Sequence, residues 1–271
     1  MANATLSGVF ARCNDENRAA LVGYLTAGDP DVEQSEVYLK TLASQVDVLE
    51  IGMPFSDPMA DGPVIQAASE RALAAACTLA DVFALCRRVR EQQPDIGIVL
   101  MGYANVPYAM GFEAFAAAAS AAGANAVLLV DIPPEEAGLC RDALQGHDLD
   151  QIFLLSPTSS ESRIRLVAEV ASGFIYYVTV AGITGAQLGG VQAIAERVAA
   201  LRLHTDLPIC VGFGIKNAEQ AEDIAQFADG VVVGSTFVSK ITDCSGDVTQ
   251  CSEVLLATAQ SMRLAMKRKE L

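Results

Sequence analysis

The chain has 271 residues, of which 52% are hydrophobic and 19% are charged, so it is long enough to bury a large core and too apolar to be intrinsically disordered. No apolar run approaches the roughly 18 residues of a membrane-spanning helix. A net charge of -15 creates a field that repels nucleic-acid phosphates, although backbone amides at a helix start can still hold a small phosphorylated ligand. We therefore expect neither a nucleic-acid partner nor a membrane partner.

The cysteines indicate a reducing compartment. There are seven of them, an odd number, and they include no CxxC pair or other zinc-like spacing. Residues 1–17 are polar and lack the apolar segment of a secretory signal. The sequence therefore predicts free thiols and a cytoplasmic protein.

Short apolar runs of strand length alternate with longer segments of helical spacing about eight times along the chain, and no change of composition marks a linker. In chain order, the predicted strands cover residues 20–25, 48–52, 97–102, 126–130, 152–155, 174–178, 208–211 and 230–233. The predicted helices cover residues 31–44, 65–92, 111–122, 134–145, 160–172, 191–201, 218–226 and 252–269. Each strand is almost entirely apolar, which is typical of parallel strands covered on both faces.

Eight such units in about 250 residues favour a (β/α)8 TIM barrel, an α/β fold, over a doubly wound sheet. We expect residues 1–271 to form a single domain, with residues 1–17 as an N-terminal helix or lead-in and residues 242–271 as a variable loop followed by the final helix. The basic residues 267–269 stand where the C-terminus of that helix would favour cations. Both folds bind ligands at the C-terminal ends of the strands, so polar residues there are the candidates for a site.

Glu50 is the first candidate for a catalytic residue. Strand alternation places Leu49 and Ile51 on one face and Val48 and Glu50 on the other, so Glu50 points into the barrel if the branched pair faces the helices. The alternative is a core glutamate paired with a base, but none of the eight predicted strands contains lysine or arginine. Burial without a cation raises the pKa of a carboxyl group toward neutrality, as a general acid and base requires.

The loop after this strand, residues 53–63, contains three prolines and two further carboxylates, Asp57 and Asp61. Prolines limit the conformational freedom of the loop, so both carboxylates can be presented at low entropic cost. The alternative is a surface turn with solvated acids.

Glycine-rich elements follow three late strands, at residues 182–185 (GITG), 212–214 (GFG) and 234–235 (GS). In barrels of this class, the loops after strands seven and eight and the start of a short extra helix, here residues 235–241, commonly bind phosphate. The combination of the last two elements favours a phosphate site, to which Ser235 can also donate its hydroxyl. Ordinary turns would explain each element alone.

The remaining functional groups favour acid–base chemistry over other mechanisms. His147 and His204 fall in loops that precede strands, at the opposite end of the barrel, so we expect no metal site. Schiff-base chemistry needs a desolvated lysine, and the one lysine near a strand end, Lys216, lies beyond the GFG turn. The GxSxG pattern of a serine nucleophile is absent from the sequence.

Three polar residues lie at or near the ends of strands three, four and six, namely Tyr103, Asp131 and Tyr176. Each is a candidate for packing or for supporting a catalytic group. For Tyr103 and Asp131 we favour the supporting role, because a polar residue at a strand end often only caps the following helix.

Several motifs occur together at these strand ends. The most specific is LEIGMPFSDP at residues 49–58, which continues to ADGP at residues 60–63. The others are LTAGDP (25–30), DIPPEE (131–136), SPT (156–158), GFIYYV (173–178) with GITG (182–185), VGFGI (211–215) and VGS (233–235). In order and spacing, they resemble the α subunit of tryptophan synthase over about residues 18–241. Residues 101–106 match that family only loosely, and residues 243–247 match no motif.

The resemblance implies a lyase of tryptophan biosynthesis that reversibly cleaves indole-3-glycerol phosphate to indole and glyceraldehyde 3-phosphate by a retro-aldol reaction. By the same resemblance, Glu50 is the general acid and base that protonates indole C3, and Asp61 accepts the indole N–H. Tyr176 borders the reacting atoms, and Thr184 belongs to a loop that closes over the site. The implied phosphate-binding positions are Gly185, Gly212, Phe213, Gly214, Gly234 and Ser235, and the implied indole pocket is formed by Tyr24, Met101, Leu128, Leu154 and Phe213.

The resemblance also implies a partner. Members of the family pair with a pyridoxal-phosphate β subunit in an αββα heterotetramer and pass indole to it, and Asp57 with its loop is the expected contact. We expect pyridoxal phosphate only on the β subunit, because this chain lacks a suitable lysine, and no cofactor on this chain.

Two alternatives remain open. The first is a barrel kept as an allosteric partner that binds phosphate without catalysis, against which the intact Glu50 and Asp61 argue. The second is another phosphate-binding barrel, such as a sugar-phosphate epimerase, whose metal-dependent members need histidine ligands that these strand ends lack.

Overall fold

Eight parallel strands close into a barrel in the computed structural model, which describes residues 4–179, 190–212, 214–244 and 246–269. Each strand pairs with its neighbours in the chain and β8 pairs with β1, which confirms the predicted (β/α)8 TIM barrel. The strands are β1 (Ala20–Thr26), β2 (Val48–Gly52), β3 (Gly97–Gly102), β4 (Ala126–Leu129), β5 (Asp150–Leu155), β6 (Ile175–Val178), β7 (Ile209–Gly212) and β8 (Gly230–Val233).

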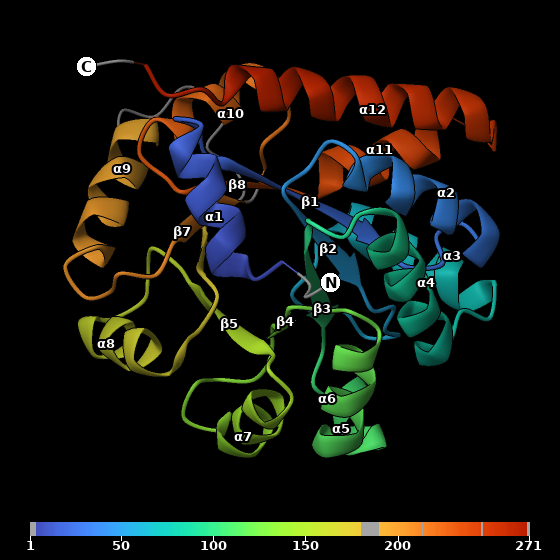
Figure 1. Ribbon diagram of the computed structural model, residues 1–271, viewed down its shortest axis with the longest axis horizontal. Helices are drawn as coiled ribbons and strands as arrows, with labels where there is room; N and C mark the ends of the chain where they lie inside the picture. Colours follow the sequence, from blue (N-terminus) through green and yellow to red (C-terminus); the bar gives the residue numbers. More distant parts are fainter. Residues whose placement is uncertain (1–3, 180–189, 213, 245, 270–271) are drawn as a thin grey trace.

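Helices surround the strands, and α12 runs along the outside against α2, α10 and α11 (Figure 1). The helices are α1 (Leu6–Asp15), α2 (Val32–Ala43), α3 (Pro63–Ala74), α4 (Leu79–Gln92), α5 (Asn105–Met110), α6 (Phe112–Ala121), α7 (Gly138–Gly146), α8 (Glu161–Val170), α9 (Gly190–Leu201), α10 (Ala218–Ala225), α11 (Ser235–Asp243) and α12 (Val248–Ala265). Among these described helices, none has the length and apolar character needed to cross a membrane.

The strands are buried on both faces, which gives the molecule two apolar layers. Outward side chains such as Leu49 and Ile51 pack against the helices, and inward ones such as Val48 and Val99 fill the barrel. Helix α1 crosses the N-terminal end of the barrel (Figure 1) and buries one apolar stripe with helical spacing against the inward residues, namely Leu6, Val9, Phe10 and Cys13. Because α1 fills this end, the barrel interior is accessible from the C-terminal ends of the strands.

A buried ion cluster holds the chain together at the N-terminal end. The Arg18 guanidinium donates to both Asp47 carboxylate oxygens, at 2.6 and 2.8 Å, and Arg263 from α12 donates to one of them at 3.0 Å. Burial by itself would raise the pKa of Asp47, but the hydrogen bonds and charges of the two arginines bring it below its ordinary value. The carboxylate is therefore ionised and ties β2 to both ends of the chain.

The predicted helix over residues 65–92 is wrong, because two helices occupy this segment. Helix α3 ends at Ala74, Ala76 takes a left-handed φ of 59°, and α4 begins after Thr78. The Thr78 hydroxyl accepts the Asp81 N–H at 3.3 Å, and the Asp81 carboxylate accepts the Thr78 N–H at 2.9 Å. Helical apolar spacing continues across the break, so periodicity hides it, whereas the T-x-x-D pattern of this capping box signals a helix start.

The end of the chain also differs from the prediction over residues 252–269. Asp247 caps α12 by accepting the Gln250 N–H at 2.9 Å, so the helix begins at Val248, and it ends at Ala265. The basic residues 267–269 therefore lie after the end of the helix. Arg268 instead donates to the carbonyl oxygens of Ala225 and Ala228, which attaches the chain end to the base of the barrel. Helix α5, six residues with an internal proline, is too short for its spacing to predict.

Candidate active site

A cavity of about 410 Å³ opens at the C-terminal ends of the strands. It is bounded by residues from β1, β2, β3, β6 and β8 and from the loops after β2, β7 and β8. Its lining residues are Tyr24, Glu50, Asp61, Gly62, Pro63, Val64, Ile65, Met101, Tyr176, Gly214, Lys216, Val232, Gly234 and Ser235. This is the end of the barrel where the sequence predicts the site.

Glu50 lies in the barrel wall at the bottom of this cavity. It pairs in register with Tyr24 of β1 and Val99 of β3, and its side chain is buried. Its Oε1 atom has no hydrogen-bond partner among the described residues. Burial is the sole cause of a rise in the pKa of Glu50 to about 8, because no cation offsets it. The carboxyl group is therefore poised to give and take a proton near neutral pH.

Asp61 reaches the same cavity from the loop after β2. Its Oδ2 atom accepts a hydrogen bond from the Tyr103 hydroxyl at 3.1 Å. The Tyr103 oxygen in turn accepts the N–H of Ala60 at 2.9 Å, and its ring stacks on Phe55 with centroids 5.2 Å apart. Burial raises the pKa of Asp61, and the hydrogen bond from Tyr103 opposes that rise. Tyr103 thus contacts Phe55, Ala60 and Asp61, all of which belong to the loop after β2.

Asp131 contacts the loop after β3. Its Oδ1 atom accepts the N–H of Ala104 at 2.8 Å, the residue that precedes α5. It therefore orders the loop after β3 rather than lining the cavity.

Two tyrosine side chains border the cavity beside Glu50. The Tyr24 hydroxyl lies 3.1 Å from the Thr26 hydroxyl, and burial raises the pKa of both Tyr24 and Tyr176. A Cβ atom on Gly52 would lie 2.1 Å from the Tyr24 hydroxyl oxygen, and one on Gly212 would lie 2.6 Å from that of Tyr176. Glycine at both strand ends therefore leaves space for the phenol groups, which remain neutral.

The other end of the cavity suits an anion. Gly234 precedes α11 and no side chain caps this helix start, so its first backbone N–H groups are available to a ligand. Ser235 and Gly214 line the cavity there, and Gly214 has a left-handed φ of 82°. Lys216 is also among the lining residues. The phosphate site predicted from the glycine pattern would fall here, and it stays a prediction.

Some predicted site residues lie elsewhere. Leu128 and Leu154 face inward on β4 and β5, in register with Met101 and Tyr176, but neither lines the cavity. Asp57 is exposed on the loop after β2, where it accepts a hydrogen bond from Ser56 at 2.6 Å. Gly212 is buried, and its lack of a side chain leaves space for the Tyr176 hydroxyl. Three predicted positions lie outside the described residues, namely Thr184, Gly185 and Phe213.

Six lining residues were not predicted from the sequence as site residues, namely Gly62, Pro63, Val64, Ile65, Lys216 and Val232. Val64 and Ile65 belong to the first turn of α3, which the predicted helix start at residue 65 obscures. Val232 faces inward on β8, as strand alternation would have indicated. Lys216 follows the GFG turn, and its reach into the cavity depends on the path of that loop.

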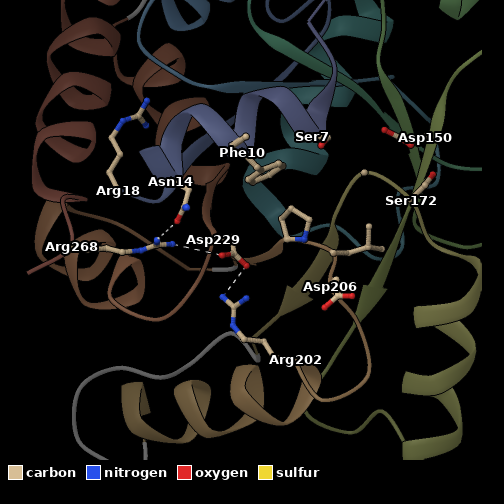
Figure 2. Close-up of a pocket in the computed structure, with 14 residues that line it drawn as sticks. Ser7, Phe10, Asn14, Arg18, Asp150, Ser172, Arg202, Asp206, Asp229 and Arg268 are labelled. Atoms are coloured by element: carbon tan, nitrogen blue, oxygen red, sulfur yellow. Dashed lines mark hydrogen bonds and ion pairs between the residues drawn. The ribbon is translucent and has the colours of Figure 1, made fainter. Parts of the chain in front are cut away.

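A second cavity, of about 530 Å³, lies at the N-terminal end of the barrel beneath α1. Figure 2 shows Arg202 and Arg268 converging on Asp229, at 2.8 and 3.6 Å. Arg18, the third arginine of the cavity, contacts Asp47. Each of the three cations thus contacts a carboxylate. Across the described ranges, no group of three or more histidine, cysteine or acidic side chains is placed to hold a metal ion.

The fold and the cavity at the C-terminal ends of the strands define an acid–base enzyme for a phosphorylated substrate. An unneutralised carboxylic acid faces one side of the cavity, and an uncapped helix start faces the other. In barrels of this kind, the C-terminal ends of the strands carry catalysis.

Comparison with known proteins identifies the family. A family model described as "Tryptophan synthase alpha chain" matches residues 10–267. The tryptophan synthase alpha chain of Thioalkalivibrio sulfidiphilus is 47% identical over 95% of this chain and 97% of its own length, and that of Geobacter sulfurreducens is 52% identical over 86% and 88%. The crystal structure of tryptophan synthase subunit alpha from Legionella pneumophila superposes with a TM-score of 0.90 at 36% identity, covering 98% of this chain and 99% of the other.

The chain belongs to the tryptophan synthase alpha chain family. It is a carbon–carbon lyase that cleaves indole-3-glycerol phosphate to indole and glyceraldehyde 3-phosphate in tryptophan synthesis. In this family, pyridoxal phosphate belongs to the β subunit.

Proposed function

We propose that Glu50 is the general acid and base of this cleavage and that Asp61 stabilises the charge that develops on the indole ring. The observation that carries the assignment is the burial of Glu50, at 1% exposure, in the wall of the cavity with no cation among the causes of its raised pKa. A carboxyl group with a pKa of about 8 is largely protonated at neutral pH, so it can supply a proton to carbon.

The reaction uses the same carboxyl group twice. The Glu50 carboxyl group first donates its proton to indole C3, and the ring nitrogen becomes positively charged. The Glu50 carboxylate then removes the proton of the hydroxyl on the adjacent side-chain carbon. The C–C bond breaks, its electron pair returns to the ring, and indole and the aldehyde leave with Glu50 protonated again. In the reverse direction, the same groups act in the opposite order.

The other groups of the cavity orient the substrate and hold charge. Ionised Asp61 accepts the indole N–H and favours the positive ring. The uncapped start of α11 binds the phosphate group together with Gly214 and Ser235, which separates the anion from the acid at the other side of the cavity. The buried Tyr176 phenol borders the reacting atoms. The roles assigned to Thr184, Gly185, Phe213, Leu128 and Leu154 stay predictions.

A direct assay tests the role of Glu50. Purified wild-type protein is given indole-3-glycerol phosphate and indole release is measured. Glu50→Gln keeps the shape of the side chain and should lower kcat about 10²- to 10⁴-fold, because it removes the proton donor. The matched control is Glu253→Gln, a change at an exposed position of α12 that should leave the rate unchanged. Wild-type turnover by Glu50→Gln would remove this residue from the role.

The family relationship also supports a partner of the β-subunit type, in an αββα complex in the cytoplasm. Three large apolar residues are exposed on this chain: Met59 of the loop after β2 is 82% exposed, Tyr108 of α5 is 73% exposed, and Leu139 of α7 is 79% exposed. These three positions follow consecutive strands at the end of the barrel where the cavity opens, and Met59 lies in the same loop as Asp57. Such a surface suits a protein partner that receives indole directly.

Addition of a β subunit tests this part of the proposal. Indole release should become faster, and Met59→Asp should weaken the activation without changing the rate of the isolated chain. An equal response of the wild-type and substituted proteins would place the contact elsewhere.

A further inference from the structure

Tyr103, the residue after β3, connects the loop after β2 to the candidate catalytic carboxylate. Its side chain is buried, and its hydroxyl oxygen accepts the backbone N–H of Ala60 at 2.9 Å. The same hydroxyl lies 3.1 Å from Oδ2 of Asp61. A phenol has one proton, and the Ala60 N–H can only donate, so the phenol proton is directed to Asp61.

This arrangement makes the two oxygens of Asp61 unequal. Oδ2 is occupied by the Tyr103 proton, whereas the described residues supply no hydrogen bond to Oδ1. A donor on Oδ2 favours the ionised carboxylate, which opposes the effect of burial on Asp61. The Tyr103 hydroxyl therefore favours the form of Asp61 that accepts a hydrogen bond.

The Tyr103 ring is itself fixed from the other side. Phe55 stacks on it with ring centroids 5.2 Å apart and an interplanar angle of 26°. Phe55, Ala60 and Asp61 all belong to the loop after β2, so the ring stack and both hydrogen bonds anchor one loop to the end of β3. Such packing holds the hydroxyl in a single direction.

We infer that Tyr103 is a positioning residue, which holds Asp61 through Oδ2 and leaves Oδ1 free to accept the N–H of the indole ring. The inference rests on the proposed function of Asp61. The other titratable groups that line the cavity are Glu50, Tyr24, Tyr176 and Lys216, and none of them is hydrogen-bonded to Asp61 within the described part of the chain.

The substitution Tyr103→Phe isolates the hydroxyl, because it retains the ring that stacks on Phe55. The loss of a hydrogen bond to a charged group should lower kcat/KM by about 10- to 100-fold. The acidic limb of the pH profile should move up by about one pH unit, because Asp61 loses a bond that favours its ionised form. The matched control is Tyr38→Phe on α2. The Tyr38 hydroxyl donates to Gln34, neither residue lines the cavity, and the substitution should leave both quantities unchanged.

A double substitution distinguishes positioning from a general effect on the fold. In an Asp61→Asn background, Tyr103→Phe should cause little further loss, because its effect passes through the carboxylate. A full additional 10- to 100-fold loss in that background, about the effect expected in the wild type, would overturn the inference. Wild-type kinetics and an unmoved acidic limb in Tyr103→Phe would overturn it as well.

A direct readout separates this inference from the proposed function. Carboxyl ¹³C NMR of the ligand-free protein should report a higher pKa for Asp61 in Tyr103→Phe than in the wild type. If wild-type protein releases no indole, the proposed function fails while the NMR titration still tests the hydrogen bond. If indole is released but the pKa of Asp61 is the same in both proteins, the positioning role alone fails.

Discussion

The pKa of Glu50 has a consequence for stability that is independent of catalysis. In the folded protein, burial raises this pKa from 4.5 to about 8. Between these two values, the carboxyl group is protonated when folded and ionised when unfolded, so unfolding releases a proton and the free energy of unfolding falls as the pH rises. This contribution is largest below pH 4.5 and is lost once the pH passes about 8.

The substitution Glu50→Gln removes this dependence, because an amide is neutral in both states. Each pKa unit corresponds to about 1.4 kcal/mol. The wild type should therefore lose about 3 kcal/mol relative to Glu50→Gln between about pH 5.5 and about pH 8. Glu50→Gln should be the more stable protein at the higher pH. In the wild type, the Oε1 atom of Glu50 has no partner among the described residues, so ionising this buried carboxyl group costs free energy.

Urea unfolding of both proteins at the two pH values measures this difference. The two proteins differ only at position 50, so contributions common to both cancel in the comparison. Glu253→Gln, on the exposed surface, serves as a control and should show no pH-dependent difference. A stability difference between wild type and Glu50→Gln that stays constant with pH would refute the raised pKa of Glu50. It would also remove the physical reason for proposing Glu50 as the general acid.

Three other substitutions test the packing near the site and the opposite end of the barrel. Gly52→Ala places a methyl group 2.1 Å from the Tyr24 hydroxyl oxygen and should cost about 1–3 kcal/mol of stability and lower kcat; a stable, fully active variant would contradict this steric account. Asp47→Asn removes the buried carboxylate that pairs with Arg18 and Arg263, so Arg18 keeps only its ion pair with the exposed Glu16; it should cost about 3–5 kcal/mol in urea unfolding, and an unchanged unfolding midpoint would contradict this. Thr78→Ala removes the capping box of α4 and should lower the free energy of unfolding by about 1 kcal/mol; equal thermal melting of variant and wild type would show that the cap is not needed.

The amino-acid sequence by itself determined the barrel and the inward position of Glu50 in its second strand. Eight apolar strands separated by helices specify parallel units, and the period of two in β2 fixes which face carries Glu50. These properties are local, because each depends on residues adjacent in the chain. Because the predicted strands contain no lysine or arginine, the sequence also predicts that the pKa of Glu50 is raised.

The tertiary structure decided what depends on residues far apart in the chain. The link from Phe55 through Tyr103 to Asp61 joins two loops more than 40 residues apart, and no spacing in the sequence indicates it. The break between α3 and α4 was hidden for the converse reason, since the apolar periodicity that predicts a helix continues through its end. Desolvation of Glu50 is likewise a property of the closed barrel, because Tyr24 of β1 and Val99 of β3 flank it in register and its side chain is left 1% exposed.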